Sequence, residues 1–206
     1  MHNVTLMDLP AKERYKLLSG AVVPRPIAFV TTESTEGNVI NAAPFSFFTM
    51  LAGDPPLLSI AVGRKQGEMK DTARNVVTHK ELVIHVVDES LVEAMNQTAA
   101  TLKADESELE LTDLALVNST SVRVPGIKEA LIRFECKLES HLPIANDDGV
   151  TAFDLLIVRV IEMHLDERVY DDEKNYVLAD QLNPVARLSG PNYAGLGELF
   201  SLKRPD

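Results

Sequence analysis

Hydrophobic and polar residues alternate regularly over residues 131–141. Because successive side chains of an extended chain point to opposite faces, this period of two predicts a strand with one buried face. The residues predicted to face the core are Ile132, Phe134, Cys136 and Leu138, and those predicted to face solvent are Arg133, Glu135, Lys137 and Glu139. Residues 153–165 have a second long strand pattern, and residues 146–149 between them are typical of a turn. The two segments therefore predict an antiparallel hairpin.

Four further stretches have the β-branched and apolar composition of strands. They are residues 27–32, a segment that returns from residue 39 after a turn at 34–38, residues 57–62 and residues 81–87. Asp54, Pro55 and Pro56 are predicted to interrupt pairing, because proline has no backbone donor. Hairpins outnumber helices, which indicates a mainly β protein with short helices (α+β), built as a closed or nearly closed antiparallel barrel.

Two short helices are predicted next to these strands. Residues 10–18 follow Asp8 and precede Gly20, which favours a capped helix that ends at the glycine. We expect this helix to pack on the outside of the barrel. Residues 71–79 predict a second helix.

Two capping boxes are also present. Ser90 with Glu93 predicts the start of a third helix, and Ser107 with Glu110 predicts another helical start. The second box lies in an acidic segment, residues 104–113, which we interpret as a solvated surface with no functional role.

The charge balance bears on the partners of the protein. The chain has 206 residues and a formal net charge of −11, a field that repels phosphate backbones and anionic membranes, so neither nucleic acid nor a membrane is predicted as a partner. No apolar run reaches the roughly 20 residues of a membrane span, and no export signal is apparent. A single cysteine rules out an internal disulfide. We expect one domain over residues 1–206 and a cytoplasmic location.

Common catalytic signatures are missing from the sequence. It contains no Gly-x-Ser-x-Gly motif and no Walker loop, which removes most support for a hydrolase or a nucleoside triphosphatase. The five histidines have no ligand-like spacing, so no metal site is predicted. Cys136 falls on the apolar face of its predicted strand, where a thiol stays protonated and inert.

Two clusters could still bind a ligand. In residues 41–48, small side chains would let a flat ligand approach the backbone, although a tightly packed turn explains the same pattern. Residues 63–75 contain four basic and two acidic residues in an otherwise acidic chain. A helix that starts at Asp71 or Thr72 would offer free backbone donors to a phosphate. The alternative is an ordinary solvated helix capped by Asp71.

These clusters carry a family resemblance. Residues 24–32, residues 41–48 and the group Lys70, Asp71, Thr72 and Asn75 occur in an order and spacing that resemble the flavin reductase-like FMN-binding split-barrel family, in its flavoredoxin-like branch. Residues 134–136 and 187–190, with Tyr193, continue the likeness. It spans most of the chain.

The resemblance implies a six-stranded split barrel that binds FMN without a covalent bond, in a homodimer whose second subunit helps to cover the flavin. By position, the flavin cradle is implied at Asn41, Ala42, Ala43, Phe45 and Ser46, the phosphate neighbours at Arg64, Lys70, Thr72 and Asn75, and a pair at the mouth of the site at Arg187 and Tyr193. His85 and Ser189 depart from the family pattern, which has a small polar residue and a glycine there.

The implied function is that of an oxidoreductase. NADH or NADPH would reduce the bound FMN, which would pass electrons to an acceptor that the sequence does not identify. One alternative is a non-catalytic FMN electron carrier served by a separate reductase. Another is a barrel that holds a different phosphorylated aromatic molecule, such as a pyridoxal derivative.

Overall fold

The computed structural model describes residues 1–206 except 36–38, 101, 103–105 and 206, so parts of the turn predicted at 34–38 and of the acidic segment 104–113 lie outside the described residues. Seven antiparallel strands form the main sheet in the order β3-β2-β6-β9-β10-β5-β4. The strands are β2 (Ala28–Glu33), β3 (Ile40–Phe45), β4 (Phe48–Gly53), β5 (Pro56–Gly63), β6 (Glu81–Val86), β9 (Ile132–Ala145) and β10 (Thr151–Leu165). The mainly β, antiparallel class is confirmed.

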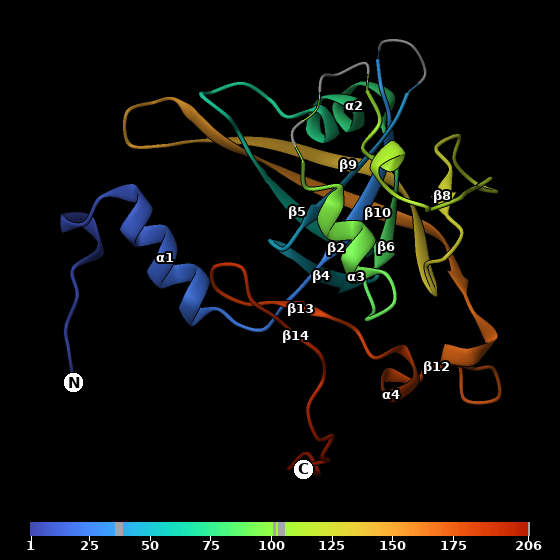
Figure 1. Ribbon diagram of the computed structural model, residues 1–206. Coiled ribbons are helices and arrows are strands. Elements are labelled where there is room, and N and C mark those ends of the chain that lie inside the picture. The colour runs from blue at the N-terminus through green and yellow to red at the C-terminus, as the bar shows by residue number, and fades with distance from the viewer. Residues whose placement is uncertain (36–38, 101, 103–105, 206) are drawn as a thin grey trace.

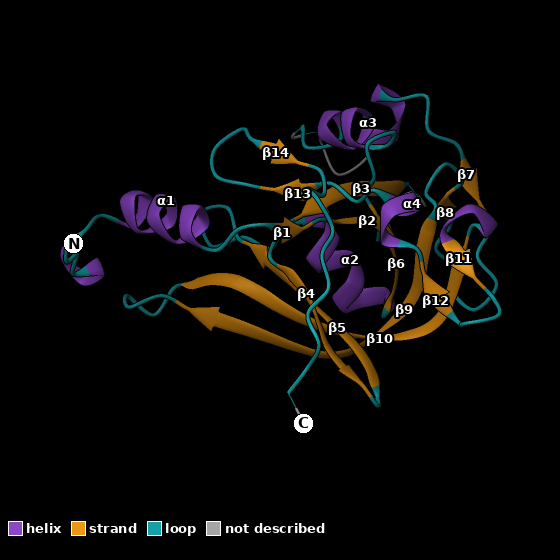
Figure 2. Ribbon diagram, turned by 90° about the horizontal axis from the view of Figure 1, so that it is seen from below, coloured by secondary structure: helices purple, strands orange, loops and turns teal. Residues whose placement is uncertain are grey.

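Short elements surround this sheet (Figures 1 and 2). The helices are α1 (Ala11–Ala21), α2 (Asp71–His79), α3 (Val92–Gln97) and α4 (Ala179–Leu182), with 3-10 turns η1 (Leu6–Asp8), η2 (Glu108–Leu111) and η3 (Glu167–Val169). The short strands are β1 (Arg25–Pro26), β13 (Ala186–Arg187) and β14 (Tyr193–Ala194) in one sheet, β7 (Leu116–Val117) with β8 (Gly126–Ile127), and β11 (Tyr170–Asp171) with β12 (Tyr176–Val177).

The main sheet has one strand more than the predicted six. The additional strand is β4, which pairs only with β5 at one edge of the sheet. Its residues Thr49, Met50 and Leu51 are all exposed, so no alternation of buried and exposed positions marks it in the sequence. Asp54 and Pro55 form the turn of the β4–β5 hairpin, and pairing resumes earlier than predicted, at Pro56 opposite Gly53.

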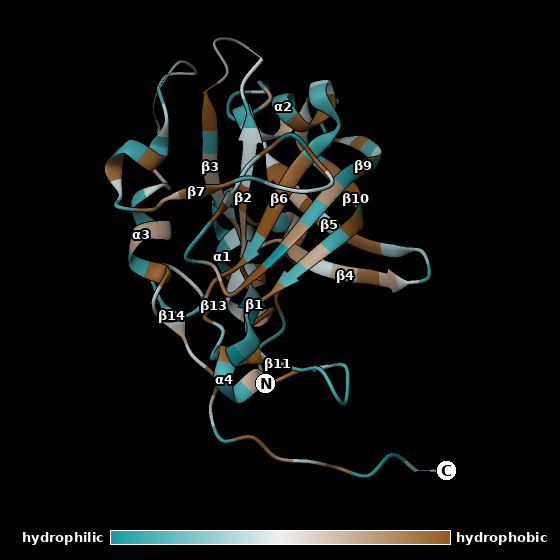
Figure 3. Cartoon of the chain, turned by 90° about the vertical axis from the view of Figure 1, so that its right-hand side faces the viewer, coloured by the Kyte–Doolittle hydropathy of each residue, from teal (hydrophilic) through white to brown (hydrophobic). Residues whose placement is uncertain are grey.

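The core has two layers, which meet at β2. Ala28 and Val30 point into the barrel with Leu58, Ile60 and Leu82, while Phe29 packs in a second cluster with Leu91 and Met95 under α3. Because both faces of β2 are covered at this point, its consecutive residues Ala28, Phe29 and Val30 are all apolar and fully buried. The hydropathy colours of Figure 3 show similar hydrophobic stretches along β3 and β6.

The helix ends differ from prediction at two places. Helix α1 continues through Gly20 to Ala21, and no side chain in the described part of the chain caps its start. Helix α3 begins after Leu91, and the carboxylate of Asp88 accepts the backbone N–H groups of Ser90 and Leu91. The predicted capping box of Ser90 and Glu93 is therefore wrong, because the Ser90 hydroxyl donates to Asp88 and no side chain among the described residues caps α3.

Helix α1 lies beside the barrel rather than flat against it (Figures 1 and 2). Its one buried residue is Ser19, so the expectation that the helix packs on the barrel is wrong for most of its length. The Tyr15 ring lies 6.3 Å from the ring of Phe47, and Arg25 donates to the carbonyls of Ser19 and Val22. None of the described helices is long and apolar enough to cross a membrane.

Candidate functional site

Two neighbouring cavities lie along edge strand β3. The first has a volume of about 560 Å³ and includes Asn41, Ala43 and Lys70 in its lining. The second has a volume of about 240 Å³, and Pro44, Phe45 and Ala99 line both. Because these three residues are shared, the cavities form one groove along β3. Most of the residues that the sequence indicates as a binding site border this groove.

The start of α2 closes one end of the groove. The helix begins at Asp71 as predicted, with Lys70 at the N-cap position, and no side chain among the described residues caps it. Asp71 instead forms an ion pair with Arg74, so the alternative in which Asp71 caps the helix is wrong. Lys70 and Thr72 line the first cavity, so a cation and the free backbone N–H groups of the first turn of α2 lie at this end, beside the carboxylate of Asp71.

A buried hydrogen-bond network holds the wall of the first cavity. The Asn41 side-chain amide donates to both oxygens of Glu108 at 2.8 Å, and its carbonyl oxygen accepts from the Thr72 hydroxyl at 3.0 Å. The backbone N–H of Ala42 also donates to Glu108. Burial raises the pKa of Glu108, although these hydrogen bonds oppose the shift. Glu108 is therefore a buried, hydrogen-bonded part of the site.

Sequence reasoning missed Glu108. It belongs to the acidic segment that we interpreted as solvated, yet it is 7% exposed and lines the first cavity. The predicted start at Ser107 is confirmed in part, because its hydroxyl accepts the N–H of Leu109 at the start of η2. That turn brings Glu108 to β3, and nothing in the local composition distinguishes Glu108 from its exposed neighbour Glu110.

The second cavity lies at the other end of the groove. Ser46, Arg187 and Tyr193 line it with Phe45. The Arg187 guanidinium lies 4.4 Å from the centre of the Tyr193 ring, and the Tyr193 hydroxyl donates to Asn96 Oδ1 at 2.9 Å. These contacts and the β13–β14 pairing fix both side chains at the edge of the cavity.

Three of the predicted site residues border neither cavity in the described part of the chain. Ala42 is fully buried in the second core cluster, and Asn75 donates to the Thr32 hydroxyl at 3.1 Å. Arg64 donates to both oxygens of Asp154, at 2.8 and 2.9 Å. Burial raises the pKa of Asp154, but the hydrogen bonds from Arg64 and His141 outweigh it and lower the pKa overall. Arg64, the residue after β5, thus takes part in an ion pair with β10.

The two departures from the family pattern lie outside the groove. His85 is fully buried, where its Nδ1 donates to the Phe29 carbonyl and its Nε2 accepts the Ile127 N–H, each at 2.8 Å. Burial lowers the pKa of His85 to about 3, so the ring is neutral. Ser189 lies in the turn between β13 and β14, next to Gly190 with φ of 59°. Cys136 is buried as predicted, and burial raises the pKa of its thiol.

Comparison with known proteins gives consistent results. The sequence model of the family described as "Flavin reductase like domain" matches residues 19–181. The uncharacterized protein YwrF of Bacillus subtilis is 60% identical over 198 residues, which is 96% of each chain.

Two solved structures of related proteins also superpose closely on this chain. Nitrilotriacetate monooxygenase component B from Bacillus cereus has a TM-score of 0.94 at 47% identity and covers 98% of both chains. Pseudomonas fluorescens 2-nitrobenzoate 2-nitroreductase NbaA has a TM-score of 0.88 at 33% identity, over 99% of this chain and 96% of that one. The chain belongs to the flavin reductase-like family of split-barrel proteins.

Proposed function

We propose that this protein is an FMN-dependent oxidoreductase that takes electrons from NADH or NADPH and passes them to a second molecule. The observation that carries the proposal is the groove along β3, which has an open helix N-terminus at one end and an aromatic and cationic pair at the other. Bound FMN would accept hydride from the nicotinamide and release electrons to the acceptor.

The donor set at the start of α2 fits the phosphate of FMN. Lys70 supplies a cation, and the uncapped first turn of α2 supplies backbone N–H groups. The Thr72 hydroxyl lies at the same end but already donates to Asn41. We therefore assign Thr72 the role of holding Asn41 in place, and Lys70 the main charge contact with the phosphate. This arrangement supports FMN over a flavin without a phosphate.

The rest of the groove fits a flat ring system. Ala43, Ala99 and Phe45 line it, and the two alanines let a planar ligand come close to the backbone. Asn41 and Ser46 add polar groups that could meet ring carbonyls or a sugar chain. The part of this chain in the reaction is then to bind the flavin, orient it and exclude water from one face.

Anaerobic reduction tests the proposal. FMN-loaded protein is mixed with NADH or NADPH without oxygen, and we expect the flavin absorbance to bleach in a single-turnover reaction. Protein that binds FMN but is reduced by neither nicotinamide would contradict the enzyme and support the electron carrier. Protein that retains no FMN but binds pyridoxal phosphate would reject the flavin assignment itself.

Two relatives suggest classes of electron acceptor. One is named as a component of a monooxygenase and the other as a nitroreductase. A partner oxygenase and a nitroaromatic compound are thus the first acceptors to supply to the reduced protein. Oxidation by 2-nitrobenzoate faster than by dissolved oxygen would favour the second class.

The Arg187→Ala variant tests the mouth of the groove. The guanidinium stacks on Tyr193 and donates to the Gly190 carbonyl, and a cation here can orient a phosphorylated, aromatic partner. We expect FMN affinity and folding to be unchanged while flavin reduction slows about 10-fold at limiting nicotinamide, as for a lost docking contact. Stopped-flow absorbance measures the rate. Arg168→Ala, which removes an exposed arginine paired with Asp166, is the control. If the Arg187→Ala variant instead loses FMN, Arg187 has a structural role and does not dock the nicotinamide.

Exposed apolar side chains on α1 and around the start of β4 support a homodimer. Tyr15 and Leu18 of α1 and Phe47, Met50 and Leu51 at β4 are each at least 48% exposed, and Tyr15 lines the cavity. We expect light scattering to give a dimer at micromolar concentration. Leu18→Asp should dissociate it and weaken FMN binding, whereas Leu116→Asp on β7 should do neither. A monomeric wild-type chain with full FMN affinity would reject the dimer.

A further inference from the structure

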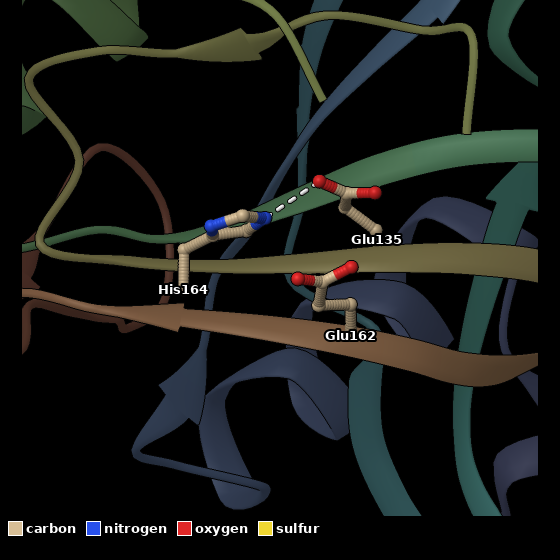
Figure 4. A group of neighbouring side chains, drawn as sticks. All are labelled: Glu135, Glu162 and His164. Atoms are coloured by element: carbon tan, nitrogen blue, oxygen red, sulfur yellow. Dashed lines mark hydrogen bonds and ion pairs between the residues drawn. The ribbon is translucent and has the colours of Figure 1, made fainter. Parts of the chain in front are cut away.

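Three potential metal ligands converge on the face of the barrel formed by β9 and β10. Glu135 comes from β9, and Glu162 and His164 come from β10, as Figure 4 shows. One ligand atom from each side chain lies within 4.8 Å of those from the other two. None of the three residues borders the groove along β3 among the described lining residues, so the cluster is separate from the proposed flavin site.

Glu135 is held in a fixed, charged state. Its side chain is 1% exposed, and its oxygens accept the backbone N–H groups of Thr120, Ser121 and Val122. Burial raises the pKa of Glu135, but these donors and His164 outweigh it and lower the pKa overall. The alternation over residues 131–141 predicts that Glu135 faces solvent, yet residues 120–122 cover it.

Glu162 and His164 complete the cluster. One Glu162 oxygen accepts the Thr120 and Ser121 hydroxyls, each at 2.6 Å, and these hydrogen bonds lower the pKa of Glu162. The His164 Nε2 lies 2.6 Å from Glu135 Oε1, and since that carboxylate is ionised, Nε2 is the donor. Donors that fix carboxylates in this way also occur behind metal ligands, where they orient the ligand atoms.

The charge of the cluster is not balanced. Glu135 and Glu162 are paired neighbours on β9 and β10, and like charges at such positions repel. Among the described residues, the ion pairs include no lysine or arginine for either carboxylate, and His164 is the sole basic partner. In contrast, Asp154 on the same strand has the guanidinium of Arg64. A divalent cation would supply the missing positive charge.

We propose that Glu135, Glu162 and His164 bind a divalent transition metal ion, with zinc as the reference ion. One imidazole nitrogen and two carboxylate oxygens suit Zn²⁺, whereas Mg²⁺ and Ca²⁺ favour oxygen ligands alone. The His164 side chain is 26% exposed, which gives the ion access from solvent. To coordinate the ion, Nε2 gives up its proton, and the ring keeps one proton by taking it up on Nδ1. The ion would fasten residues 120–122 to the barrel through Glu135 and Glu162.

Calorimetry with Zn²⁺ tests the site. Tag-free protein freed of metal by a chelator is titrated with zinc chloride at pH 7, and we expect one ion per chain. His164→Ala and Glu162→Gln should each weaken binding at least about 10-fold. Glu135 is not substituted, because its carboxylate accepts three backbone N–H groups and a Glu135→Gln variant can fail to fold without that charge. Visible absorption of the Co²⁺-loaded protein reports the ligand set independently.

His141→Ala is the matched control. His141 also pairs with a buried carboxylate of β10, Asp154, at 2.8 Å, but it belongs to no three-ligand set in the described part of the chain. We expect this variant to bind zinc as the wild type does. Wild-type protein that takes up no stoichiometric zinc, or a His164→Ala variant with unchanged affinity, would overturn the site and leave His164 as a structural partner of Glu135.

Discussion

The Lys70→Ala variant is expected to bind FMN about 10- to 100-fold more weakly than the wild type while its riboflavin affinity stays the same. Lys70 lines the first cavity beside the uncapped start of α2, where the proposal puts the phosphate. Riboflavin has the same ring system but no phosphate, so the comparison separates loss of the charge contact from damage to the cavity. Quenching of flavin fluorescence during titration measures both affinities.

Lys174→Ala is the control for Lys70→Ala. It removes the same charge from an exposed side chain that pairs with Asp171 on the surface. The net charge of both variants is one unit more negative, and thus any general electrostatic effect on an anionic ligand appears in both. Equal weakening of FMN and riboflavin by Lys70→Ala would show that the phosphate lies elsewhere.

His85→Leu is expected to lower the free energy of unfolding by about 2–5 kcal/mol at pH 7. Leucine fills a similar volume, but the Phe29 carbonyl and the Ile127 N–H lose their partner in a fully buried position. Each unpaired buried group costs about 1–3 kcal/mol. Urea unfolding followed by circular dichroism measures the change. A loss below about 0.5 kcal/mol would mean that water or a backbone shift satisfies both groups.

The same variant changes the pH dependence of stability. The pKa of His85 is about 3 in the folded chain, and an unfolded histidine titrates near pH 6.5. Between these values the unfolded state takes up a proton that the folded state does not, so stability falls as the pH falls, by up to about 1.4 kcal/mol per pH unit. We expect His85→Leu to lack this contribution, whereas His2→Leu in the exposed N-terminal segment should keep it. An identical pH slope in His85→Leu would contradict the buried neutral histidine.

Local pattern was sufficient for most of the fold. The alternation over residues 131–141 predicts β9, and the polar turn after it predicts the β9–β10 hairpin, because both signals depend on neighbours in sequence. The start of α2 at Asp71 was predicted for the same reason. Strand β4 was missed because it lies at an edge with mostly exposed side chains and therefore needs no alternation.

The candidate site could be predicted only in part, because the sequence around a residue does not show whether a distant segment will bury it. Glu108 reaches the groove through its bonds to Asn41, 67 residues away in the sequence. Glu135 is covered by residues 120–122, and Arg64 is paired with Asp154, 90 residues away. The family resemblance correctly assigned Asn41, Lys70 and Arg187 to the groove. It could not show that Arg64 pairs with Asp154 instead of lining the groove.

The backbone of β3 has a consequence for how the protein avoids self-association through its open edge. The Ile40 carbonyl accepts the Ser107 hydroxyl, and the Ala42 N–H donates to Glu108, so both groups point away from β2. Two residues further on, Pro44 presents the same side and has no N–H to offer. A strand from another molecule would thus find these positions already occupied or lacking a donor. The wall of the groove can remain accessible to a flat ligand without acting as a template for aggregation.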